Sequence, residues 1–307
     1  MIGEPAVREE IMPVMSDVHE SDSAATAISV RRVGPSLGAE VVGVDLSRPI
    51  STDVFREVEE AFLKYKVLVF PDQDLTQDQM VAFTQLWGAA GQHIVAGKKA
   101  EGHEALPAIN LLSNATLDGK PNGKHTDESA KRWHTDRSYQ TIPAMASMLY
   151  SIEVPTSGGD TLFSNAVAAY EALPVERKQA IDSRIAVHWI KYSHRIAGKG
   201  LATDEEIDRT PPVRHPLARK HPVTGEKAIY CGAHAASVEG LDEQQGRALL
   251  NGLVEHLSQP QFVYRHKWRK HDLVMWDNRC TLHAATDFDG QELRVLWRTT
   301  IVGTPTM

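Results

Sequence analysis

Short apolar stretches separated by Gly, Pro and Asp make up most of the chain from residue 28 onward. Apolar residues recur every three or four positions after Ser51, which predicts a helix capped by that serine. The continuously apolar run Val67–Phe70 ends at a Pro-Asp pair and predicts a buried strand. Thr76 and Gln79 have the spacing of a capping box, so a second helix is predicted to follow that strand.

The rest of the pattern favours strands over helices. No Gly-rich phosphate loop and no regular alternation of strands and helices is present in the sequence. We therefore predict a mainly β fold with flanking helices. The predicted strands lie at 145–152, 161–163, 228–230, 262–268, 273–276 and 294–301, and further helices at 166–182 and 242–257.

Two segments lack a sustained period. Residues 1–25 mix acidic, small and Pro residues, which is typical of a flexible N-terminal tail. Residues 88–132 are rich in Gly, Lys, Asn and Asp, and insertions of that length commonly form lids or binding loops. No interdomain linker is visible, so residues 26–307 are predicted to form a single domain that carries this lid insertion.

Composition narrows the class of protein. The net charge of −7 argues against a nucleic-acid binder or an anionic-membrane binder. No apolar run approaches the roughly 20 residues of a membrane helix. The only two cysteines, Cys231 and Cys280, cannot build a disulfide framework. These features favour a cytoplasmic enzyme whose partner is a small molecule.

The sequence contains two His-x-Asp triplets, a pattern that chance alone supplies about once in such a chain. His125 and Asp127 lie in a polar segment without apolar neighbours, which favours a solvated loop. His134 and Asp136 follow a tryptophan and precede a predicted strand, so an extended backbone would place both side chains on one side. Two His and one carboxylate form the facial set of non-haem Fe(II) sites. A distant second histidine is therefore needed.

His283 is the favoured candidate because a segment with two arginines follows it. On an extended strand, Arg294 and Arg298 would share one face, and both faces of that strand look buried. Buried guanidinium groups call for anions, and a dicarboxylate co-substrate would supply them. Two other classes stay open on the residues alone: a Zn(II) hydrolase using the same three ligands, and a jelly-roll protein that binds an anion without chemistry.

Several longer motifs resemble one enzyme family. In chain order they are WHTDRSY (133–139), VPTSGGDTLF (154–163), HPVTGEKAIYCGAHAASVEGL (221–241) and DLVMWDNRCTLHAA (272–285). They are similar to the signatures of the TauD/TfdA family of Fe(II)- and 2-oxoglutarate-dependent dioxygenases. The last two motifs, with FVYRHKW (262–268) and LLSNATLDGK (111–120), look closer to the aryloxyacetate (2,4-D type) branch. Ala130 stands where taurine enzymes have a substrate-contacting Asn, which disfavours the taurine branch.

The resemblance implies a double-stranded β-helix, or jelly roll, and a set of site residues. His134, Asp136 and His283 would be the iron ligands. Thr161 and Arg294 would bind the distal carboxylate of 2-oxoglutarate, Arg298 would lie near its C1 carboxylate and the anion of the prime substrate, and His93 would also contact that anion.

The implied activity is an oxidation that consumes O2 and 2-oxoglutarate and gives succinate and CO2. The expected substrate is a small organic anion resembling an aryloxyalkanoate, whose hydroxylated product can fragment. A sulfonate, a sulfate ester or an amino-acid-like molecule is the alternative. Relatives commonly form dimers or tetramers, so a homo-oligomer is expected.

Overall fold

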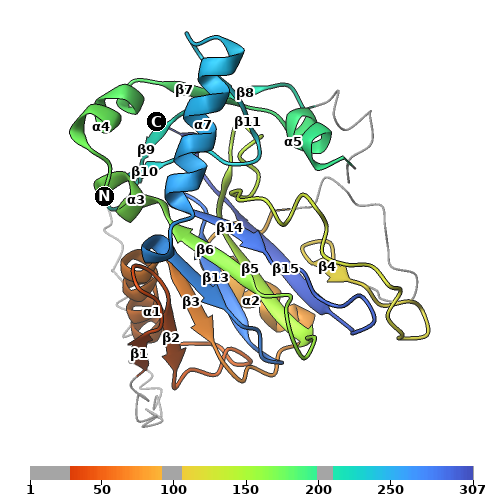
Figure 1. Ribbon diagram of the computed structural model, residues 1–307. Coiled ribbons are helices and arrows are strands. Elements are labelled where there is room, and N and C mark those ends of the chain that lie inside the picture. Colours follow the sequence, from red (N-terminus) through yellow and green to blue (C-terminus); the bar gives the residue numbers. More distant parts are fainter. Residues whose placement is uncertain (1–27, 92–105, 199–209, 307) are drawn as a thin grey trace, which may run out of the picture.

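A seven-stranded sheet is the largest element of the computed structural model, which describes residues 28–91, 106–198 and 210–306 (Figure 1). Its pairs are antiparallel except β2 with β3. The strand order is β1 (Ser29–Arg32), β2 (Ala39–Val42), β3 (Val67–Phe70), β13 (Leu273–Asp277), β5 (Ala144–Glu153), β15 (Val295–Val302) and β4 (Asn110–Ser113).

Two helices pack against this main sheet, and both begin where their caps predict. Helix α1 (Thr52–Tyr65) starts after Ser51, whose side chain accepts a hydrogen bond from the backbone N–H of Val54. Helix α2 (Gln77–Leu86) starts after Thr76 with a complete capping box. Their apolar faces join strand residues in one core cluster. The local signals therefore determined both helix starts correctly.

A second layer of three antiparallel strands completes the β fold. It consists of β12 (Val263–His266), β6 (Thr161–Asn165) and β14 (Thr281–Ala285) in that order. Phe163 of this layer packs with Trp276 and Leu296 of the main sheet, and all three are buried. Two facing layers of mostly antiparallel strands are the arrangement of a jelly roll.

Helices and short strands cover one end of the second layer, where the long helix α7 is prominent in Figure 1. The region contains a β11-β7-β8 sheet and a β9-β10 hairpin. Its elements are α3 (Ala166–Glu171), α4 (Val175–Asp182), β7 (Ile185–His188), α5 (Ile190–Ala197), β8 (Val213–Pro216), β9 (Ala218–Lys220), β10 (Lys227–Ile229), β11 (Ala235–Val238), α7 (Glu243–Leu257) and the 3-10 turn η1 (Pro260–Phe262).

Strands β1, β2, β7, β8, β9, β11 and β14 and helix α5 were not predicted, and two predicted segments differ from the structure. The helix predicted at 166–182 is broken into α3 and α4, because Pro174 has no N–H to donate and disfavours a helical residue before it. The predicted insertion at 88–132 is not all loop, since it contains β4, which pairs with β15 at the edge of the main sheet. The predicted tail at 1–25 lies outside the described residues. Among the described helices, none is long and apolar enough to span a membrane.

Candidate metal centre

Two distant histidines are joined directly by their backbones. His134 donates to the carbonyl of His283 at 3.0 Å, and His283 donates back to His134 at 2.7 Å. Their ring centroids are 4.1 Å apart. The bridge is a single isolated pair, and Asp136 already begins a turn, so the extended segment predicted at 134–136 is shorter than expected. The pairing nevertheless brings strand β14 beside the triplet.

Asp136 completes a compact group with these histidines. One ligand atom from each of His134, Asp136 and His283 lies within 4.8 Å of the other two. Asp136 is 6 % exposed and accepts a hydrogen bond of 2.6 Å from the hydroxyl of Ser147. Nη1 of Arg298 lies 3.5 Å from Oδ1 of Asp136. A cation can therefore be surrounded by two imidazoles and one carboxylate at this point.

The protonation states suit a divalent ion. Burial would raise the pKa of Asp136, but Arg298 and the two neighbouring histidines outweigh it and hold that pKa well below its usual range. Burial lowers the pKa of His134, and burial together with His134 lowers the pKa of His283 to about 3. A metal requires neutral imidazoles and an ionised carboxylate, which are the forms present near neutral pH. Nδ1 of His134 lies 2.7 Å from the carbonyl of Arg132, which leaves Nε2 for an ion.

The turn after β13 is hydrogen-bonded to the segment that carries the metal-ligating residues. Asn278 is fully buried, and its carbonyl accepts a hydrogen bond of 2.8 Å from the hydroxyl of Thr135. Its backbone N–H donates to Met145 on β5 at 2.9 Å. This turn therefore ties the segment that carries Asp136 to the main sheet. Asn278 was not among the residues predicted from the sequence.

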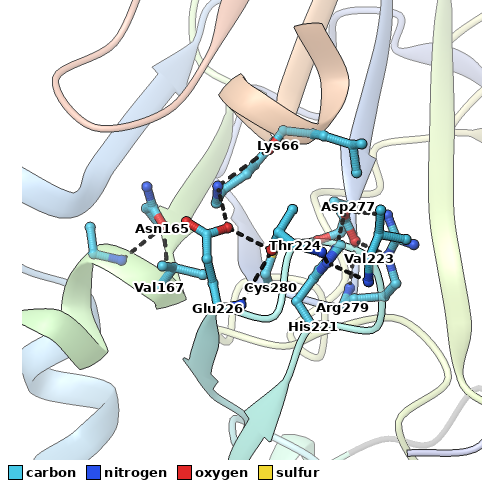
Figure 2. A network of polar contacts seen from close by, with 12 residues as sticks. Lys66, Asn165, Val167, His221, Val223, Thr224, Glu226, Asp277, Arg279 and Cys280 are labelled. Carbon is cyan, nitrogen blue, oxygen red and sulfur yellow. Dashed lines mark hydrogen bonds and ion pairs between the residues drawn. The ribbon is translucent and has the colours of Figure 1, made fainter. Parts of the chain in front are cut away.

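A second group of metal-ligating residue types, His221, Asp277 and Cys280, lies nearby and has other partners (Figure 2). Nε2 of His221 is 3.0 Å from the carboxylate of Asp277, and Nδ1 of His221 accepts from the backbone N–H of Thr224 at 3.0 Å. Arg279 donates to both oxygens of Asp277 at 2.8 and 2.7 Å. Because these lone pairs are already used, the group is an ion-pair network that fixes the turn containing Asn278.

The other His-x-Asp triplet stays apart from the metal-ligating group. Nδ1 of His125 lies 2.8 Å from the carbonyl of Phe288, and the carboxylate of Asp127 accepts from the backbone N–H of Ser129 at 2.7 Å. An aspartate bonded two residues onward is a local turn. The structure thus places His125 and Asp127 in the surface setting that the polar context predicts.

Thr161 and Arg294 are each hydrogen-bonded to a neighbouring residue. The indole of Trp268 donates to the hydroxyl oxygen of Thr161 at 3.1 Å. Arg294 donates through Nε and Nη2 to the carbonyl of Gly159 at 3.2 and 3.0 Å, and burial lowers the pKa of Arg294 to about 10. Gly159 has φ +65°, and a Cβ there would lie 3.0 Å from Nε of Arg294, so the close approach needs glycine.

Both arginines belong to the β15 segment. Arg294 directly precedes the strand, which begins at Val295 and pairs with β4 in regular register as far as Arg298, while the pairing with β5 skips Ile152 of β5. The common face predicted for the two arginines stays a prediction. Arg298 lies inside the strand, and its Nε is buried without a hydrogen-bond partner among the described residues. An unpaired buried donor of this kind fits a carboxylate of a co-substrate. His93 lies outside the described residues.

Comparison with known proteins finds a matching family and similar enzymes that depend on alpha-ketoglutarate. The family model "Taurine catabolism dioxygenase TauD, TfdA family" matches residues 29–300. The 2,4-dichlorophenoxyacetate dioxygenase of Cupriavidus pinatubonensis, which depends on alpha-ketoglutarate, is 37% identical over 87% of this chain and 94% of the relative. The (S)-phenoxypropionate/alpha-ketoglutarate-dioxygenase of Sphingobium herbicidovorans is 31% identical over 91% of this chain and 96% of the relative.

A solved structure is also similar to this chain. The crystal structure of AAD-2 in complex with Mn(II) and N-oxalylglycine is 38% identical, with a TM-score of 0.81 over 92% of this chain and 99% of that one. Fold, site and comparisons together define an oxidoreductase of the Fe(II)- and 2-oxoglutarate-dependent dioxygenase class. The chain belongs to the TauD/TfdA family. The predicted jelly roll, enzyme class and cofactors, Fe(II), 2-oxoglutarate and O2, are confirmed, and the hydrolase and binding-protein alternatives are not supported.

Proposed function

We propose that this enzyme oxidises a C–H bond of a small aryloxyalkanoate-like carboxylate, with His134, Asp136 and His283 as the Fe(II) ligands. The approach of these three side chains to within 4.8 Å of one another carries the proposal. When bound, the metal supplies the redox chemistry that couples decarboxylation of 2-oxoglutarate to oxidation of the substrate. The two histidines and the aspartate would hold the ion, and three protein ligands would leave coordination positions for the co-substrate and O2.

The arginines and Thr161 orient the keto acid. Arg294 and Thr161 bind its distal carboxylate, and Arg298 lies near its C1 carboxylate. The carbonyl of Gly159 holds the Arg294 guanidinium, and Trp268 holds the oxygen of Thr161, so the hydroxyl proton of Thr161 remains available to donate. These contacts restrict the rotamers of both side chains before the ligand arrives.

Substrate choice depends on the insertion at 88–132, as the lid of a single domain that spans residues 26–307. Its strand β4 places Asn110 opposite Arg298. Gly91, two residues before His93, donates to the carbonyl of Thr300 at 2.7 Å, two residues beyond Arg298. Both contacts bring described parts of the insertion beside the stretch of β15 that contains Arg298, and the proposed contact of His93 with the substrate anion rests on the family resemblance alone. The identity of the relatives favours a carboxylate attached to an aryl ether as that anion.

The proposal also covers the oligomeric state and the cellular location of the enzyme. A homo-oligomer, dimer or tetramer, is proposed on the resemblance to relatives alone, and analytical ultracentrifugation tests it. A cytoplasmic location is supported by Cys231 and Cys280, which are both buried free thiols rather than a disulfide.

The experiment for the site is spectroscopic. Anaerobic addition of Fe(II) and 2-oxoglutarate to the purified protein is expected to give the visible metal-to-ligand charge-transfer band. Turnover is then measured as succinate formed per substrate consumed with aryloxyalkanoates, sulfonates, sulfate esters and amino acids. Coupled turnover with aryloxyalkanoates supports the substrate class. If the band appears but only sulfate esters give coupled turnover, the proposed site is supported and the proposed substrate class is contradicted.

A further inference from the structure

A second buried guanidinium lies outside the metal centre, on strand β9. Arg219 is 2 % exposed, and its Cζ lies 4.7 Å from the ring centroid of Tyr230. The Tyr230 ring in turn lies 5.5 Å from that of His188 and 5.6 Å from that of His215. Nε2 of His215 is 2.8 Å from the carbonyl oxygen of Ser138. These five buried residues are called the Arg219 cluster below.

Six polar side-chain atoms of the Arg219 cluster lack hydrogen-bond partners in the part of the chain that the structure describes. Nε and Nη1 of Arg219, both ring nitrogens of His188, the Tyr230 hydroxyl and the Ser138 hydroxyl have no hydrogen-bond partner among the residues described. Buried polar groups without partners are rare in folded proteins. The six atoms belong to four side chains, which are linked to one another through ring contacts and His215. We infer that a single partner that is not part of the protein satisfies them.

The charge of the cluster shows what kind of partner that is. Burial, together with His215 and His234, lowers the pKa of His188 well below its ordinary value, and burial lowers the pKa of His215 to about 4. Both histidines are therefore neutral near neutral pH. Arginine is a cation in proteins, and Nε and Nη1 of Arg219 meet no carboxylate within the described part of the chain. A buried guanidinium without an anion is strongly unfavourable.

We propose that the Arg219 cluster is an internal binding site for a small monovalent anion, either a carboxylate such as formate or a halide. The unpaired N–H groups of Arg219 and the unpaired O–H groups of Tyr230 and Ser138 are all donors of the kind that an anion accepts. A water molecule could accept some of these hydrogen bonds, but it would leave the positive charge uncompensated.

The proposed anion site is formed by other residues than the sites proposed for 2-oxoglutarate and substrate. Arg294 and Arg298 lie at the start of and within β15, whereas Arg219 lies in the β9-β10 hairpin. The two regions are linked through Ser138, which follows Asp136 by two residues and whose carbonyl is bonded to His215. An anion at Arg219 therefore stabilises the segment that carries Asp136 without contacting the metal.

Thermal unfolding tests the proposal. Sodium formate is added to the full-length protein at constant ionic strength, which is maintained with a bulky sulfonate salt. The Tm of the wild type is expected to rise by roughly 3 °C for each tenfold increase in formate above its Kd. Arg219→Met should abolish this rise. Arg265→Met is the control, since Arg265 is half exposed and already pairs with Asp160, and this variant should retain the rise.

A flat response of the wild type, or an equal rise in Arg219→Met, would overturn the proposal. If Arg219→Met does not fold, Tyr230→Phe replaces it, because loss of one donor should raise the formate concentration needed for half the Tm shift. A crystal soaked in sodium bromide gives a test without substitutions. An anomalous peak in contact with the Arg219 guanidinium supports the site, and bromide found only elsewhere contradicts it.

Discussion

Asn278 holds Asp136 through its backbone and its carboxylate at once. Oδ1 of Asn278 accepts from the backbone N–H of Asp136 at 3.2 Å, and Nδ2 donates to the hydroxyl oxygen of Ser147 at 3.0 Å. The Ser147 hydroxyl then donates to Oδ2 of Asp136 at 2.6 Å. The other carboxylate oxygen, Oδ1, faces Nε2 of His283 at 3.9 Å. Asn278 and Ser147 therefore determine which oxygen is free to bind an ion.

Loss of the Ser147 hydroxyl should weaken metal binding. Ser147→Ala removes the only side-chain donor bonded to Oδ2 among the described residues, so the carboxylate of Asp136 can rotate. Removing such an outer partner commonly costs about 10- to 100-fold in metal affinity. Titration of the metal-free protein with Fe(II) under anaerobic conditions, followed by the charge-transfer band with 2-oxoglutarate, measures the change.

Ser151→Ala is the matched control for that experiment. Ser151 is also a buried serine of β5, but its hydroxyl donates to the carbonyl of Arg269 at 2.7 Å, away from the metal-ligating group. Its loss should lower the free energy of unfolding by about 1 kcal/mol and leave the Fe(II) affinity unchanged. Similar affinities in the two variants would show that Ser147 does not act through Asp136.

Asp136→Ala should reduce succinate formation to background, because a bound ion would lose its only carboxylate ligand of the proposed set. Asp127→Ala removes a carboxylate with a local hydrogen bond to Ser129 and should keep nearly full activity. The two variants are compared by succinate formed at saturating Fe(II). An equal loss of activity in both would show that the wrong triplet was assigned.

The parts of the fold that sequence predicted are those with local causes. The caps at Ser51 and Thr76 and the uniformly apolar Val67–Phe70 depend on neighbours within a few residues. Strand β4 was partly hidden in a polar insertion, because its pairing partner β15 lies far along the chain. The break at Pro174 was overlooked because apolar periodicity continues on both sides of it. Long-range pairing leaves little trace in a single sequence.

The residues of the candidate site also divide into those with a local signal in the sequence and those joined only by tertiary contacts. Spacing and context selected His134 and Asp136 from two triplets, and the structure places them beside His283; their role as ligands stays a prediction. Asn278 and Ser147 were missed, since one lies in a turn and the other in an apolar strand, and only tertiary contact joins them. The common strand face predicted for the arginines stays a prediction, since β15 pairs with β4 in regular register from Val295 to Arg298 and Arg294 directly precedes it.

Arg294→Lys should raise the KM for 2-oxoglutarate. The planar guanidinium is held by the carbonyl of Gly159 and can still present other N–H groups to a carboxylate, whereas a lysine amine cannot make both contacts in that geometry. Loss of one charge-assisted hydrogen bond corresponds to about 10- to 100-fold. Arg265→Lys is the control, because Arg265 pairs with Asp160 and is half exposed. Succinate formation at varied 2-oxoglutarate separates the two, and a raised KM in both would contradict the assignment.

Stability should fall as the pH drops below about 6.5, the ordinary pKa of histidine. Burial lowers the pKa of His215 to about 4 in the folded chain, so between pH 6.5 and 4 only the unfolded chain binds a proton at this residue. A depressed pKa therefore gives stability that is complete above 6.5 and is lost as the pH falls, with a slope approaching about 1.4 kcal/mol per pH unit for one group. Urea unfolding of the metal-free protein at pH 7.5, 6 and 5 measures this slope. His215→Gln should reduce the slope by up to the contribution of one proton, about 1.4 kcal/mol per pH unit. An unchanged slope would show that His215 is already protonated in the folded chain.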